Sequence, residues 1–135
     1  MGEAINTKWK EYLPSISADG NLFIFTRRAP HYNSIYSEDF FSSVFKDDRW
    51  TLAKNLGPNI NTYGNEGAQC LTSDGSVLFF TACDREDGYG GCDIYLSYLT
   101  ENGWSDAKKF RSKYKHKVLG NSTKYFCRWK TYIFC

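Results

Sequence analysis

The sequence predicts an all-β protein: a β-propeller fragment of two consecutive four-stranded antiparallel blades, followed by an irregular C-terminal tail. A set of residues recurs along the 135-residue chain at a spacing of 54 to 55, and a period of this length indicates repeated structural units. Each copy holds four short runs rich in aromatic and β-branched residues, which suit strands. Four matched strands per copy favour blades over a plain β-sandwich, whose strands do not normally recur as matched sets.

Each copy is expected to contain the same four strands in the same order. The first strand ends in an Asp-Gly pair, Asp19-Gly20 or Asp74-Gly75, because glycine accepts the positive φ of a tight turn. The expected strands are residues 13–17, 22–26, 39–43 and a short one at Trp50 in the first copy, and residues 68–72, 77–82, 93–98 and a short one at Trp104 in the second. The first blade then spans residues 1–57 and the second spans residues 58–109.

The end of the chain differs from the rest in charge. Residues 1–109 carry ten Lys and Arg against fifteen Asp and Glu, a net charge of −5, whereas residues 110–135 carry seven Lys and Arg and no acidic residue, a net charge of +7. A basic tail with interleaved aromatic residues would suit a natural extension or a nucleic-acid patch. The repeat also stops where a third blade would begin, so we expect no native blade in residues 110–135.

A shifted reading frame explains this tail better than nucleic-acid binding does. Codons chosen for residues 109–135, read after removal of one adenine, encode NLGPNTNTKYWETAPSISADGKRIFF. That string repeats the start of the first blade, NTKWKEYLPSISADGNLFIF, gap for gap. Two bases of nearly every shifted codon are fixed by the protein sequence, so chance explains the match poorly. We therefore interpret the tail as the frameshifted start of a third blade and expect no nucleic-acid partner.

The second copy carries a resemblance to a known family. Residues 61–75, which read NTYGNEGAQCLTSDG, resemble the WD-like, TolB-type propeller repeats of bacterial envelope proteins, and the match continues through residues 78–95. The first copy departs from the pattern at residues 27–31, where RRAPH replaces the cysteine-flanked loop. The resemblance implies a place in the periplasm or at the outer membrane, in association with OmpA-like domains. It also implies other envelope proteins, or further blades, as partners.

Cys83 and Cys92 flank an acidic, glycine-rich connection between the second and third strands of the second copy. Strand ends joined by such a loop bring their Cα atoms close enough for a disulfide. Together with the resemblance, this favours a bridge over two free thiols, and a disulfide requires an oxidising compartment such as the periplasm. Cys70 lies in a predicted strand and is expected to be an ordinary buried thiol.

Loops at the strand ends supply the other candidate sites. The expected partner contacts are His31, Tyr32 and Tyr36 in an aromatic loop of the first copy, and Arg85 and Tyr89 in the cysteine-flanked loop of the second. The second loop also holds three carboxylates with a weak resemblance to a Ca²⁺ site, namely Asp84, Asp87 and Asp93. Their spacing does not fit the EF-hand loop, so a solvated acidic loop is the favoured interpretation and we expect no metal or cofactor.

No catalytic constellation is visible in the sequence. His31 is the single histidine before the tail, and neither a nucleophile elbow nor a phosphate-binding loop occurs. No apolar stretch reaches the length of a membrane span. The sequence therefore predicts a non-enzymatic, protein-binding scaffold of the bacterial envelope, whose open blade edges would promote self-association. The alternative is a propeller domain of a glycan hydrolase or a peptidase.

The gene itself tests the reading-frame hypothesis. DNA sequencing through codon 109 should show a run of adenines, because one extra adenine in such a run would produce the observed tail. Removal of that adenine should continue the repeat into a third copy. Codons that cannot yield the shifted string would contradict the hypothesis.

Overall fold

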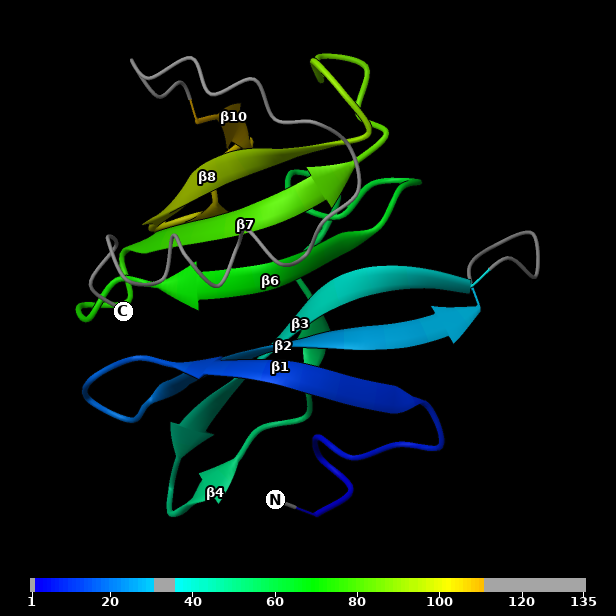
Figure 1. Ribbon diagram of the computed structural model, residues 1–135. Coiled ribbons are helices and arrows are strands. Elements are labelled where there is room, and N and C mark those ends of the chain that lie inside the picture. Colours follow the sequence, from blue (N-terminus) through cyan, green and yellow to red (C-terminus); the bar gives the residue numbers. More distant parts are fainter. Residues whose placement is uncertain (1, 31–35, 111–135) are drawn as a thin grey trace.

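The computed structural model describes residues 2–30 and 36–110, and in these residues the chain forms two antiparallel sheets and no helix (Figure 1). The first sheet contains β1 (Lys10–Ile16), β2 (Leu22–Pro30), β3 (Tyr36–Lys46), β4 (Arg49–Trp50) and β5 (Lys54–Asn55). The second contains β6 (Glu66–Leu71), β7 (Val77–Cys83), β8 (Cys92–Thr100), β9 (Gly103–Trp104) and β10 (Lys108–Lys109). The prediction of an all-β chain with two antiparallel units is confirmed. The expectation for the tail concerns residues 110–135, of which residues 111–135 lie outside the described residues.

Both sheets have the same connectivity. The strands of the first sheet follow the order β1-β2-β3-β4, with β5 also paired to β3. Those of the second follow the order β6-β7-β8-β10, with β9 also paired to β8. In the described part of the chain, no helix is long and apolar enough to cross a membrane.

The outer strand of each sheet is split, where the sequence predicted one short strand at Trp50 or Trp104. The split has the same cause in both sheets. The N–H of Ala53 donates to the Ala4 carbonyl at 2.9 Å, and the N–H of Ala107 donates to the Asn59 carbonyl at 3.0 Å. Each outer strand therefore turns one donor away from its neighbour in the sheet and towards the segment that enters the unit, which keeps the backbone hydrogen bonds satisfied.

A β-bulge occurs at the same place in both units. Leu13 has a φ of 50° and Ala68, 55 residues later, has a φ of 53°. The register between β1 and β2 shifts at the first of these residues, and the register between β6 and β7 shifts at the second. Non-glycine residues rarely adopt positive φ. Two such residues at matching positions therefore indicate that the two units share a kink in the first strand.

The predicted Asp-Gly turns are present in both units. Gly20 and Gly75 have φ values of 75° and 70°, the region that glycine adopts without strain. The Thr72 hydroxyl donates to Asp74 Oδ1 at 2.6 Å, and in the first unit the Ser17 hydroxyl donates to Asp19 Oδ1 at 2.5 Å. The bond from Thr72, together with bonds from the turn that follows, lowers the pKa of Asp74 to about 2. The turns are therefore closed by ionised aspartates at neutral pH.

The two sheets pack against each other through one apolar core, in which β6 lies against β1, β2 and β3 of the first sheet (Figure 1). The fully buried Phe40 meets Phe80 edge to face, with ring centroids 5.4 Å apart. The side chain of Gln69 bridges the sheets as well, donating to the Leu13 carbonyl and accepting from the Thr26 hydroxyl. Because aromatic burial and satisfied polar groups both span the joint, the two sheets form one packed body.

Candidate functional site

A largely buried Glu–Arg pair joins the first two strands of the first sheet. Glu11 on β1 opposes Arg27 on β2 in register, and Arg27 Nε donates to Glu11 Oε1 at 2.9 Å. The Arg27 guanidinium also donates to the Ile5 carbonyl at 2.9 Å, and the Thr7 hydroxyl donates to the Glu11 carboxylate. Arg27 Cζ lies 4.2 Å from the centroid of the Phe41 ring. We call this arrangement of threonine, glutamate, arginine, carbonyl and ring the Glu–Arg clamp.

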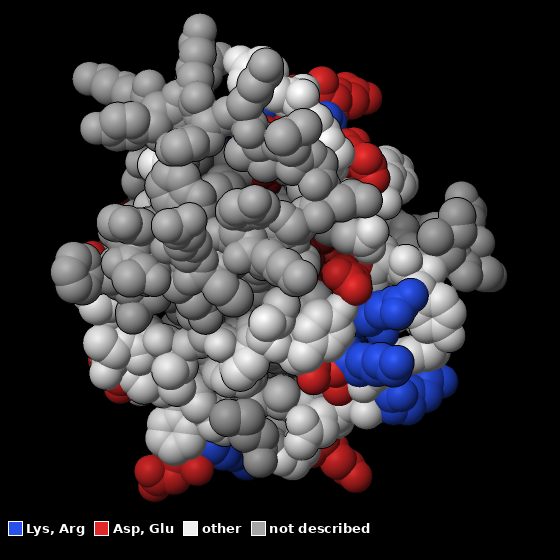
Figure 2. Space-filling model, in the orientation of Figure 1, with Lys and Arg blue, Asp and Glu red and all other residues white. Residues whose placement is uncertain are grey.

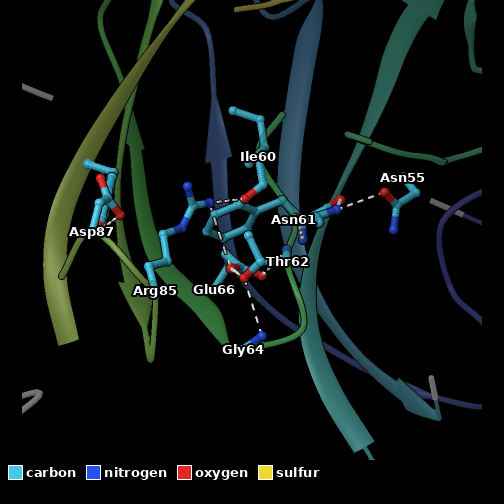
Figure 3. A network of polar contacts seen from close by, with 10 residues as sticks. Asn55, Ile60, Asn61, Thr62, Gly64, Glu66, Arg85 and Asp87 are labelled. Atoms are coloured by element: carbon cyan, nitrogen blue, oxygen red, sulfur yellow. Dashed lines mark hydrogen bonds and ion pairs between the residues drawn. The ribbon is translucent and has the colours of Figure 1, made fainter. Parts of the chain in front are cut away.

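The second sheet contains the same clamp (Figure 3). Glu66 is fully buried and accepts hydrogen bonds from the N–H and the hydroxyl of Thr62. Arg85 Nη2 lies 3.8 Å from Glu66 Oε1 and donates to the Ile60 carbonyl. Arg85 Cζ lies 4.6 Å from the centroid of the Tyr95 ring. Thr62, Glu66 and Ile60 each follow their counterparts by 55 residues, and Tyr95 follows by 54.

The arginine is the exception, because it comes from different chain positions in the two clamps. The residue 55 positions after Arg27 is Ala82, and it opposes Glu66 in register as Arg27 opposes Glu11. Arg85 comes three residues after Ala82, beyond the end of β7, and turns its side chain back into the same place. The two sheets therefore share the position of the guanidinium and not the position of the residue.

Burial governs the chemistry of the second clamp. It raises the pKa of Glu66, while the bonds from Thr62 and the charge of Arg85 oppose that rise. Both carboxylate oxygens of Glu66 accept hydrogen bonds within the protein. Arg85 Nε is buried and has no hydrogen-bond partner within the described ranges. These contacts give the clamp a structural role.

The residues that the sequence predicts as partner contacts differ in their exposure to solvent. Arg85 turns inward, with its side chain only 12% exposed, so the expectation of a surface contact is wrong for this residue. Tyr89 is 78% exposed and lies on the surface of the loop, where Lys109 Nζ approaches its ring centroid at 3.4 Å. Tyr36 is 51% exposed. His31 and Tyr32 lie outside the described residues.

The carboxylates of the second loop are occupied by protein groups. Asp87 accepts a hydrogen bond from the Tyr95 hydroxyl at 2.7 Å. Asp93 accepts one from the Tyr89 N–H at 2.7 Å and pairs with Lys109 at 3.0 Å. In residues 2–30 and 36–110, no three His, Cys, Asp or Glu side chains gather as a metal site would require. The structure does not bring Asp84 together with these two aspartates.

The predicted disulfide is confirmed. Cys83 and Cys92 oppose each other in register at the ends of β7 and β8, and a bond joins them with the Cα atoms 3.9 Å apart. A side chain at Gly64 would place its Cβ 2.2 Å from the Cys83 carbonyl oxygen, so only glycine fits beside the bridge. Cys70 is buried, as expected.

A basic and aromatic hollow lies at the edge of the first sheet, where β1 begins, β2 ends and β3 begins. Its volume is about 370 Å³, and its lining residues are Lys8, Trp9, Lys10, Arg28 and Tyr36. The Trp9 and Tyr36 rings meet edge to face with centroids 6.2 Å apart. In Figure 2, Lys and Arg side chains gather on the right of the molecule, the side where β1 begins in Figure 1. We call this feature the basic hollow.

Sequence reasoning missed the basic hollow and the Glu–Arg clamps. A signal for the clamps was visible, because Thr7 and Glu11 recur as Thr62 and Glu66 at the repeat spacing. No comparable signal marks the basic hollow, since its residues come from three separate segments and do not recur in the second copy.

Comparison with known proteins adds no relative. No protein-family model matches the chain, and no curated protein or solved structure matches it. The resemblance to TolB-type repeats therefore rests on the sequence alone, over residues 5–108, and is most specific in the second copy.

The shared position of the guanidinium gives a rescue experiment. Arg85→Ala leaves the buried Glu66 without its cation and should lower the free energy of unfolding by about 3–5 kcal/mol. Adding Ala82→Arg should recover at least half of that loss, because residue 82 opposes Glu66 as Arg27 opposes Glu11. Unfolding in urea, followed by circular dichroism, measures both changes, and the exposed Arg49→Ala serves as control. A folded double variant no more stable than Arg85→Ala would contradict the shared design.

The disulfide should stabilise the second sheet by limiting the unfolded chain. Replacing Cys83 and Cys92 together by serine should lower the free energy of unfolding by about 2–3 kcal/mol, the value expected for a loop of this length. The same urea experiment measures the loss under non-reducing conditions. An unchanged urea midpoint would show that the bridge does not constrain the unfolded chain.

Proposed function

We propose that this chain is a pair of β-propeller blades that serves, without catalysis, as a protein-binding scaffold in the bacterial cell envelope. One observation carries the proposal: the two sheets share their interior design and differ at their loop ends. The bulges, the Asp-Gly turns, and the threonine, glutamate and ring of the clamps recur at 54 to 55 residues, and the clamp arginine keeps its place in space although not in the chain. The basic hollow and the cysteine-flanked loop each occur in one unit only.

This division of labour is typical of a scaffold. A rigid interior fixes the frame, and the loops that it carries are free to differ and to contact partners. Residues that line the basic hollow in the first unit, Trp9 and Arg28, are replaced by Gly64 and Cys83 at the repeat spacing. Tyr36 and Tyr89, which the sequence predicts as partner contacts, are both more than half exposed. Exposed tyrosines at loop ends suit recognition of a protein.

Two further observations support the proposed class and compartment. The disulfide between Cys83 and Cys92 favours an oxidising compartment such as the periplasm. The buried carboxylate of Glu66 is engaged by Thr62 through both oxygens, and Asp87 and Asp93 also accept hydrogen bonds from protein groups. Carboxylates held in this way stabilise structure and are poorly placed to act on a substrate.

Quantitative binding tests the proposal. The full chain, immobilised, should retain a protein from a bacterial envelope fraction that then binds in purified form, by isothermal titration calorimetry, with a defined stoichiometry. Tyr36→Ala or Tyr89→Ala should weaken that binding by about tenfold or more, as expected for interface tyrosines. Tyr63→Ala is the matched control, since Tyr63 is 95% exposed and lies outside both loops.

Two results would contradict the proposal. One is binding that none of the loop substitutions weakens. The other is hydrolysis of a glycan or a peptide by the purified chain, because that activity would place the protein in the enzyme class.

A further inference from the structure

We infer that the basic hollow binds a carboxylate-rich segment of a partner protein. The inference rests on the proposed scaffold function and adds the chemistry of the partner. Three cations and two aromatic rings form the hollow. The cations match the carboxylates of an acidic polypeptide, and the rings match an apolar side chain beside them.

The cations of the basic hollow are available for a ligand. Within the described part of the chain, ion pairs engage Arg27, Arg85 and Lys109, and none engages Lys8, Lys10 or Arg28. Lys8 and Lys10 are exposed, so a ligand can reach them without any change of fold.

An acidic residue opposes one of these cations. Glu38 opposes Arg28 in register on β3, and its carboxylate accepts a hydrogen bond from the Tyr12 hydroxyl. It offsets part of the Arg28 charge, and no described carboxylate forms an ion pair with either lysine. A cluster of uncompensated cations is also unusual here, because residues 1–109 carry a net charge of −5. The three cations therefore attract an anionic group to this point of a region whose net charge is negative.

The aromatic walls favour a polypeptide as the carrier of the anionic groups. Lys8 Nζ lies 4.8 Å from the Trp9 ring centroid, and Arg28 Cζ lies 5.6 Å from the Tyr36 ring centroid. Trp, Tyr and Arg are the residues that dominate binding energy in protein interfaces. A volume of about 370 Å³ accepts a few side chains and falls in the usual range for ligand pockets.

The basic hollow is held in place by the Glu–Arg clamp. The Trp9 N–H donates to Thr7 Oγ1 at 3.1 Å, and the same Thr7 hydroxyl donates to the clamp carboxylate of Glu11. Lys10 and Arg28 face each other across β1 and β2 in register. The backbone that carries Trp9, Lys10 and Arg28 is therefore in place before a ligand arrives, which lowers the entropic cost of binding.

The second unit shows that the hollow is a specialisation of the first. Gly64 takes the place of Trp9 at the repeat spacing, and its N–H makes the same bond to the Thr62 hydroxyl at 3.2 Å. Cys83 takes the place of Arg28, and its carbonyl oxygen fills the space where a side chain on residue 64 would begin. The second unit therefore keeps the hydrogen bond to the threonine but has no ring at the position of Trp9 and no cation at the position of Arg28.

An acidic segment suits the hollow better than a nucleic acid does. Nucleic-acid sites follow a phosphate backbone with a stripe of basic residues over many ångströms. Here the cations occupy one spot beside two rings, in a region of net negative charge. A short run of Asp and Glu with an apolar neighbour matches that layout, as in other motifs read by basic clusters.

Fluorescence anisotropy tests the inference with the full chain and a fluorescein-labelled peptide of alternating Asp and Glu that ends in Phe. We expect saturable binding that weakens with added salt and falls by about tenfold or more in Trp9→Ala and in Arg28→Gln. The exposed Lys8→Gln should weaken it by a smaller factor, and it keeps the test valid if Trp9→Ala does not fold. Arg49→Gln, outside the hollow, is the matched control and should bind as the unsubstituted chain does.

Several outcomes would overturn the inference. One is equal binding of a control peptide with Gln and Asn in place of the acidic residues. Another is binding that the substitutions in the hollow leave unchanged. Tighter binding of single-stranded RNA or of phosphatidylglycerol vesicles through the same residues would assign the hollow to another ligand. If the envelope partner depends on Tyr89 but not on Trp9 or Arg28, the inference fails and the scaffold stands. If the peptide binds in the hollow but no envelope protein is retained, the scaffold fails.

Discussion

A guanidinium held between a largely buried glutamate and an aromatic ring organises each of the two sheets. It joins the segment that enters the unit, through the carbonyl of Ile5 or Ile60, to the first strand, through Glu11 or Glu66. Removing a charged pair from water costs free energy that only good geometry and extra hydrogen bonds offset. The threonine hydroxyls and the backbone carbonyls supply those bonds, so entry segment, first strand and ring are fixed together. The residues that follow the threonine, Trp9 in the first unit and Gly64 in the second, are held in place by their bond to its hydroxyl.

The part of the fold that depends on local signals could be predicted from the sequence. The Asp-Gly turns carry their own geometry, because Gly20 and Gly75 accept a positive φ and the neighbouring aspartates bond to the hydroxyl before them. The repeat spacing then located the remaining strands. The split of the outer strands was not predictable, because it depends on the Ala53 N–H meeting the Ala4 carbonyl, a contact between residues far apart in the chain. Leu13 shows the same limit, since its side chain gives no sign that its backbone bends.

The candidate site was only partly predictable, for a related reason. Cys83 and Cys92 were paired correctly, since the strands that carry them are neighbours in sequence and in the sheet. Arg85 follows a strand in an acidic loop, a setting that indicates solvent exposure, and its inward turn depends on a space lined by Tyr95. The basic hollow combines residues from three segments, so only the paired strands reveal that Lys10 and Arg28 face each other.

The arginine that reaches one place from two chain positions bears on how such units diverge. Ala82 stands where Arg27 would be expected, and Pro30 stands 55 residues before Arg85. A column-by-column alignment of the two units therefore scores a lost charge at both positions, although the ionic contact is intact in each fold. What the two interiors share is the place of the positive group, and its attachment point lies on a strand in one unit and in a loop in the other. Distant members of such a lineage would look less related by sequence than their interiors are.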